Sequence, residues 1–177
     1  MFTEPLPSTL DARKAAVRGV SVSGKLALPK MERVSTLLAS TEGSVEAECA
    51  FSRDEENRSV IDISVRANVE VTCQRCLEPM PLEVVAENRL ALVADDDEAK
   101  ALPERLEPLL LEDEACDLWS LVEDEIILKL PIVSYHDTAA CQQTLEEYKA
   151  PPPEAGTGRE NPFAVLEQLK SGNQNQE

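Results

Sequence analysis

Four residues in this sequence have the types and spacing to bind a metal ion or to carry out thiol chemistry. Cys73 and Cys76 form a C-x-x-C pair, and His136 and Cys141 form a looser pair further along the chain. Tetrahedral zinc sites commonly take thiolates and imidazoles from two such pairs. One interpretation is therefore a single structural zinc ion, with Cys73, Cys76, His136 and Cys141 as its four ligands.

Two other interpretations of the C-x-x-C pair stay open. A thiol oxidoreductase needs the first cysteine at a helix N-terminus, where the helix dipole lowers its pKa. Here the pair is followed by "LEPMPLEV", whose two prolines and period-two pattern do not predict a helix, so redox catalysis is the less favoured alternative. The other alternative is a pair of unligated thiols in a hairpin turn, and the spacing alone does not separate it from zinc binding.

The remaining residues offer little for catalysis. The sequence has one histidine, no G-x-S-x-G motif and no glycine-rich phosphate loop. Glu123, Asp124 and Glu125 are consecutive, so in a helix they point in different directions and are expected to form a solvated face. Cys49 lies on the apolar side of a predicted strand, and Cys116 follows three acidic residues that oppose a thiolate. We therefore expect a protein that is not an enzyme.

A long hairpin is expected to present the C-x-x-C pair at its tip. Residues 61–73 alternate between apolar and polar, and residues 80–92 resume the alternation beyond the cysteines. Two strands of this length joined by a tight loop form an antiparallel hairpin. Similar alternation predicts two earlier strands, in residues 20–28 and 44–52.

Helices are expected on either side of the hairpin in the sequence. Apolar residues at helical spacing predict a short helix within residues 29–40 and another in residues 118–130, N-capped by Asp117 and ended by Pro131. Residues 94–117 carry ten acidic residues and two prolines, which favours a mostly irregular connection. The predicted fold class is α+β: a small, mainly antiparallel sheet or open barrel with a long hairpin, plus two or three helices.

The chain of 177 residues suits one domain with appendages. We expect a single α+β domain in residues 1–145, a flexible Pro/Gly linker in residues 146–161, and a C-terminal helix with a disordered tail in residues 162–177. The apolar runs are too short to cross a bilayer, and the first residues lack the order of a secretory signal. The five cysteines are odd in number and unevenly spaced, which does not suggest a disulfide framework. We therefore expect a cytoplasmic protein that does not contact the membrane.

The charge is acidic and unevenly distributed. The chain has a net charge of -17, yet residues 1–35 hold six Lys/Arg against three Asp/Glu, whereas residues 80–130 hold four against fifteen. Phosphate backbones are bound through Lys and Arg with release of counterions, so a chain this acidic is expected to bind nucleic acid poorly by itself. A basic protein is the expected partner, and no small-molecule substrate is expected.

The order of the segments resembles the YceD family of bacterial proteins, known as large ribosomal RNA subunit accumulation proteins. The resemblance rests on "VTCQRCLEPM", on "DLWSLVEDEIILKLPIVSYHD" with a following cysteine, and on "NPFAVLEQLK", and it extends to "PLPSTLDARKAAVRGVSVSGKLALPKMERV" near the start. It implies a role in the synthesis, processing or stability of 23S ribosomal RNA, and it implies no catalytic residue. Many relatives have several cysteines in the loop where this sequence has His136 and Cys141.

The charge and the resemblance together predict a non-enzymatic factor in large-subunit ribosome biogenesis. It is expected to bind a basic ribosomal protein or assembly factor through the acidic segment 95–117 and to contact ribosomal RNA indirectly. In a second route, the basic amino-terminal region and Arg75 touch RNA directly. The competing function is a thiol oxidoreductase or metal-dependent enzyme that uses Cys73 and Cys76.

Overall fold

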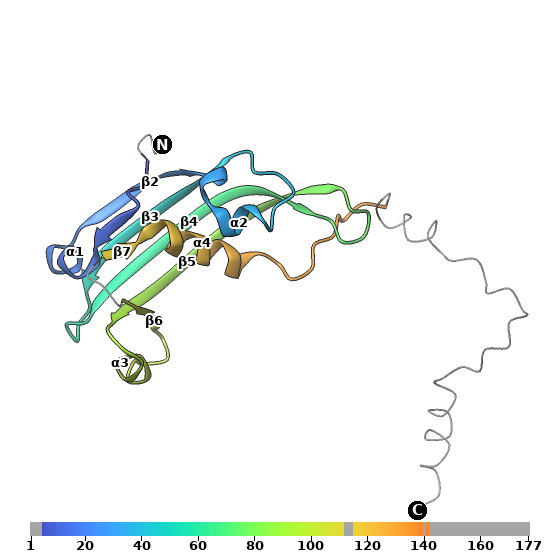
Figure 1. Ribbon diagram of the computed structural model, residues 1–177. Coiled ribbons are helices and arrows are strands. Elements are labelled where there is room, and N and C mark those ends of the chain that lie inside the picture. Colours follow the sequence, from blue (N-terminus) through green and yellow to red (C-terminus); the bar gives the residue numbers. More distant parts are fainter. Residues whose placement is uncertain (1–4, 112–114, 140, 142–177) are drawn as a thin grey trace, which may run out of the picture.

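The computed structural model describes residues 5–111, 115–139 and 141, and it arranges most of them around one long twisted sheet (Figure 1). The predicted linker in residues 146–161 and the predicted C-terminal helix in residues 162–177 lie outside the described residues. Among the described helices, none is long and apolar enough to cross a membrane.

The main sheet has five strands in the order β2-β3-β4-β5-β6. Four of them pair in antiparallel fashion, and β6 adds to β5 in parallel. The strands are β2 (Ser21–Ala27), β3 (Ser44–Arg53), β4 (Ser59–Thr72), β5 (Pro79–Val93) and β6 (Glu107–Leu110). The predicted α+β class with a mainly antiparallel sheet is confirmed, and the sheet is open, with β2 and β6 at its edges.

Strands β4 and β5 are the predicted long hairpin, and its register runs from Val60 opposite Ala91 to Thr72 opposite Pro79. Successive side chains of a strand point to opposite faces, so one parity of β4 is buried throughout. These buried residues are Ile61, Ile63, Val65, Ala67, Val69 and Val71. The same parity continues to Cys73, which the hairpin therefore delivers to the inner side of its tip.

Most of the helical segments lie over one face of the sheet, and one lies beyond its end, next to β6 (Figure 1). The helical segments are α1 (Ala12–Arg18), the 3-10 turn η1 (Leu28–Lys30), α2 (Glu32–Ser35), α3 (Asp96–Lys100) and α4 (Leu118–Lys129). Small alanines of α1 and the apolar side of α4 join the inward residues of the sheet in one core. Asp117 caps α4 as predicted, because its carboxylate accepts hydrogen bonds from the backbone N–H groups of Trp119 and Ser120.

The expectation of a mostly irregular segment in residues 94–117 was wrong. Asp95 caps α3 by accepting from the N–H groups of Asp97 and Glu98, β6 adds to the edge of β5, and β7 (Ala115–Asp117) pairs with β1 (Thr9–Asp11). The partners of β6 and β7 come from other parts of the chain, so the local acidic pattern gave no sign of them. The helix predicted within residues 29–40 is also shorter, consisting of η1 and α2.

Candidate metal centre

The turn between β4 and β5 holds Cys73 and Cys76 in a compact loop. The N–H of Leu77 donates to the carbonyl oxygen of Cys73, and the N–H of Cys73 donates to that of Glu78, both at 2.9 Å. Leu77 has φ of 63°, a left-handed conformation uncommon outside glycine, and this reverses the chain into β5. The chain passes from Cys76 into a strand, so the pair lacks the helix N-terminus that would activate a redox thiol.

The loop that follows α4 packs against this turn. The backbone N–H of Gln74 donates to the carbonyl oxygen of Ser134 at 2.9 Å, and its side-chain amide donates to that of Ile132 at 3.2 Å. Because α4 is fixed on the sheet by its apolar side, these two hydrogen bonds determine where the loop runs. They bring His136 and Cys141 beside the C-x-x-C pair.

All four residues predicted as ligands come together in the structure. One ligand atom from each of Cys73, Cys76, His136 and Cys141 lies within 4.8 Å of the other three. We call these four residues the cysteine–histidine cluster. The sulfurs of Cys73 and Cys141 are 3.6 Å apart, and the sulfur of Cys76 is 3.3 Å from Nδ1 of His136. A tetrahedral zinc ion separates two sulfurs by roughly 3.8 Å and a sulfur from a nitrogen by roughly 3.5 Å, so the spacing fits such an ion.

The imidazole of His136 is held in the tautomer that a metal ligand needs. Its Nε2 lies 3.2 Å from the carbonyl oxygen of Pro79, which can only accept, so Nε2 carries the proton and donates it. Nδ1 is then left with a free lone pair directed at Cys76 and the centre of the cluster. Metal-binding histidines usually donate their second N–H to a carbonyl or carboxylate in this way.

Electrostatics in the cluster favour a bound cation. Burial raises the pKa of Cys73, but backbone N–H groups of Cys76, His136 and Arg75 donate to its sulfur and lower that pKa overall. Burial and the neighbouring sulfurs of Cys73 and Cys76 raise the pKa of Cys141. Thiolates packed this closely repel one another, and a divalent cation between them would remove the conflict.

Arg75, at the tip of the hairpin, has defined contacts. Its guanidinium lies over the ring of Tyr135, 4.7 Å from the centroid, and its Nη1 is 4.0 Å from the sulfur of Cys141. Stacking on an aromatic face stabilises a cation. Three thiolates around a divalent zinc leave a net negative charge, and Arg75 is placed to offset it.

The other two cysteines belong to the core. Cys49 is buried as predicted, and Cys116 lies in β7 with only 2% of its surface exposed. Burial raises the pKa of Cys49 to about 12 and that of Cys116 to about 11, so both remain thiols at neutral pH. Neither takes part in the cysteine–histidine cluster.

The prediction of a solvated acidic face on α4 was wrong for two of its three residues. Glu123 is 8% exposed, and its carboxylate accepts from the backbone N–H groups of Arg33 and Val34 at 2.9 and 3.2 Å. Glu125 is 4% exposed and accepts from the side-chain amide of Asn88. Glu123 and Asp124 both bind the guanidinium group of Arg33, and only Glu125 points elsewhere, toward Asn88. These partners lie far away in the sequence, where local spacing gives no signal.

Comparisons with known proteins agree on one family. A model of the family described as "Large ribosomal RNA subunit accumulation protein YceD" matches residues 61–170, a range that includes the whole cysteine–histidine cluster. A protein of Haemophilus influenzae with the same name is 34% identical over 167 residues, which are 93% of this chain and 96% of that relative. No solved structure matches the chain.

Proposed function

The chain belongs to the YceD family, and from that membership we propose that it is needed for 23S ribosomal RNA to accumulate. The protein promotes the synthesis, processing or stability of this RNA during large-subunit assembly in the bacterial cytoplasm. The observation that carries the proposal is the relative from Haemophilus influenzae, which is named a large ribosomal RNA subunit accumulation protein and aligns over nearly its whole length.

The cysteine–histidine cluster supports a binding factor rather than an enzyme. Catalytic zinc sites keep one position open for water or substrate, whereas structural sites fill all four positions with protein ligands. Four protein donors converge here, so we assign Cys73, Cys76, His136 and Cys141 to one structural zinc ion. The ion would fasten the loop of residues 131–139 to the hairpin tip, and no step of a reaction passes through it.

A basic ribosomal protein or assembly factor is the proposed partner. The carboxylates of Asp95, Asp96, Asp97 and Glu98 are exposed on α3 and its cap, at one end of the sheet. An acidic surface of this kind attracts lysine- and arginine-rich proteins and speeds their association. In this arrangement ribosomal RNA is reached mainly through the partner.

Deleting the gene tests the biological role. The ratio of 23S to 16S ribosomal RNA should fall in the deletion strain and recover when the wild-type protein is supplied. An unchanged ratio would contradict the proposed role.

The mode of action has its own test. A pulldown with the full-length protein at low salt should recover a basic ribosomal protein or assembly factor, and the recovery should fall as salt rises. Thiol–disulfide exchange by the purified protein that is abolished by Cys73→Ser would instead favour the oxidoreductase.

A further inference from the structure

One groove of this acidic protein is lined by cations. It has a volume of about 440 Å³ and is formed by Arg13, Lys14, Val17, Arg18, Arg53 and Ser59, with no carboxylate among these residues. We call it the arginine groove. It lies between α1 and the end of β3, whereas the cysteine–histidine cluster lies at the opposite end of β4. Since the chain has 34 acidic and only 17 basic residues, four cations in one groove are a departure from its overall charge.

Three of these cations form no ion pair with a carboxylate of the described residues, although the charge of Arg18 helps to lower the pKa of Asp11. Among the ion pairs between described residues, none includes Arg13, Arg18 or Arg53. Arg53 donates to the backbone and side-chain oxygens of Asn57, which are neutral. Lys14 does pair with Asp11, at 2.7 Å. Within the described part of the chain, Arg13 and Arg53 therefore have no carboxylate at ion-pair distance, and Arg18 has only the longer-range attraction of Asp11.

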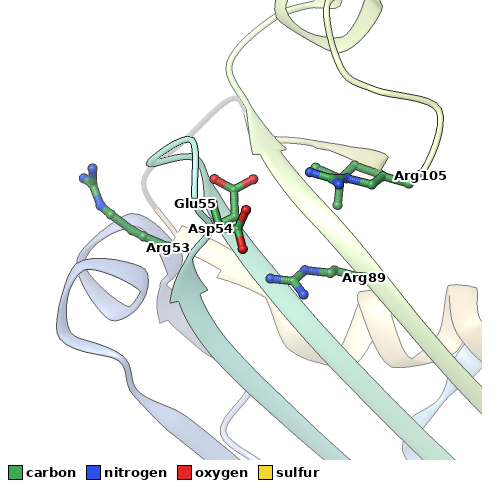
Figure 2. Close-up of a pocket in the computed structure, with 6 residues that line it drawn as sticks. Arg53, Asp54, Glu55, Arg89 and Arg105 are labelled. Carbon is green, nitrogen blue, oxygen red and sulfur yellow. The ribbon is translucent and has the colours of Figure 1, made fainter.

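The other side of the β3–β4 turn provides a contrast. A groove of about 360 Å³ there also contains arginines, namely Arg53, Arg89 and Arg105, but Asp54 and Glu55 line it as well. In Figure 2 the carboxylates of Asp54 and Glu55 project from the turn on the side of Arg89 and Arg105. Arg53 points away from these two carboxylates. Of the two grooves, only the arginine groove has no carboxylate in its lining, so an anion is expected to bind there rather than beside Asp54 and Glu55.

We propose that the arginine groove binds the phosphodiester backbone of RNA. This inference deepens the proposed function and rests on it, because ribosomal RNA is the anion that the proposed role supplies. Guanidinium groups bind phosphate through paired N–H donors, and each such contact releases counterions. The acidic net charge does not prevent this, because charges are screened over about 8 Å at physiological salt.

The neighbouring acidic helix limits the contact to a short stretch of RNA. Arg13 and Arg53 also line an adjacent groove, and Glu98 of α3 lies on that groove. A phosphate chain that continued toward α3 would meet Asp96 and Asp97 as well. The RNA contact is therefore weak and sensitive to salt by itself. The basic protein partner would supply the remaining affinity of the complex.

Filter binding of the full-length protein to transcribed 23S ribosomal RNA tests the inference. The test variant Arg13→Ala/Arg18→Ala removes two cations and leaves the contact between Arg53 and Asn57 intact. The control variant Lys25→Ala/Arg66→Ala also removes two cations, which face Glu46 from either side on the sheet. Both variants are first checked for unchanged circular dichroism and melting temperature, and Arg13→Ala/Arg53→Ala is a second test variant.

The test variants should bind at least about tenfold more weakly at low salt, and the slope of log affinity against log salt should fall by about 1.5. The control should stay within about twofold of the wild type. Equal loss in test and control variants, no loss in either, or displacement by poly-glutamate as effective as by RNA would overturn the inference. If one of these results is found and the 23S to 16S ratio still falls in the deletion strain, the RNA-binding inference is wrong but the proposed function stands. An unchanged 23S ratio in the deletion strain removes that function itself.

Discussion

Nδ1 of His136 lies 3.3 Å from the sulfur of Cys76, although 60 positions separate the two residues in the chain. This contact depends on a hydrogen bond on the far side of the ring, where Nε2 donates to the carbonyl oxygen of Pro79. The ring is therefore positioned by the hairpin that carries the C-x-x-C pair. Cys76 and the carbonyl group of Pro79, which hold the two sides of the ring, both belong to the hairpin tip. The cluster is therefore assembled once the loop after α4 packs against this tip.

Zinc content is the most direct check of the cluster. Purified wild-type protein should contain about one zinc per chain, and Cys73→Ser or His136→Ala should lose most of it, because each removes one of four ligands. Cys49→Ala and Cys116→Ala are matched controls, since these buried thiols lie outside the cluster. Elemental analysis of the five proteins measures this. Full zinc retention in Cys73→Ser would rule out the assigned ligand set.

Removing the metal should loosen the tip and leave the sheet folded. The amide of Gln74, bonded to Ser134, should exchange hydrogen faster after chelation, because the ion fastens this loop to the hairpin. The amide of Val65, in the middle of β4, should keep its protection, since the strand pairing there does not involve the cluster. Hydrogen exchange with and without chelator measures both. Loss of protection at Val65 would show that the whole domain depends on the metal.

Glu123 should be the most costly of the three acidic residues of α4 to replace. Glu123→Ala should lower the free energy of unfolding by about 2–3 kcal/mol, because the N–H groups of Arg33 and Val34 lose their charged acceptor. Asp124→Ala is the matched control and should cost less than about 1 kcal/mol, since that carboxylate forms an exposed ion pair with Arg33. Urea unfolding of both variants gives the comparison. Equal costs would contradict the structural role of Glu123.

Glu125 should make the stability depend on pH. Burial raises its pKa above the ordinary value of 4.5, with a further contribution from Glu107. The folded state therefore binds this proton more tightly than the unfolded state, and the resulting stabilisation is lost as pH rises through the raised pKa. Glu125→Gln should melt at a higher temperature than the wild type at pH 7. The difference should shrink as pH falls through this raised pKa and should be smallest below about 4.5. A difference that stays constant from pH 7 to below this value would contradict the assignment.

The local sequence pattern was sufficient to predict those features of the fold that depend on residues close together in the chain. Burial of one face gives a strand its period of two, so the alternation in residues 61–73 and 80–92 identified the hairpin that became β4 and β5. Asp117 could be recognised as a cap because its bonds reach only to the next turn of the helix. The C-x-x-C pair was likewise visible, since both thiols lie in one turn.

Long-range partners could not be read from the same patterns. The carboxylate of Glu123 binds the backbone of Arg33, 90 positions earlier, and a periodic helix pattern cannot distinguish such a buried carboxylate from a solvated one. The strand β6 forms because the edge of β5 offers unpaired backbone groups, which the acidic composition of that segment does not reveal. The arginine groove likewise joins cations of α1 to Arg53, at the far end of β3.

Residue order was enough to predict the hairpin, the helix at Leu118–Lys129, the two pairs of candidate ligands and the family, because each shows in the residue types and spacing of short segments. The tertiary structure alone decided that the ligands converge, which carboxylates are buried and where the arginines gather. These features depend on which surfaces meet when the sheet twists and the helices pack on one face, and contacts between distant residues are set by that packing.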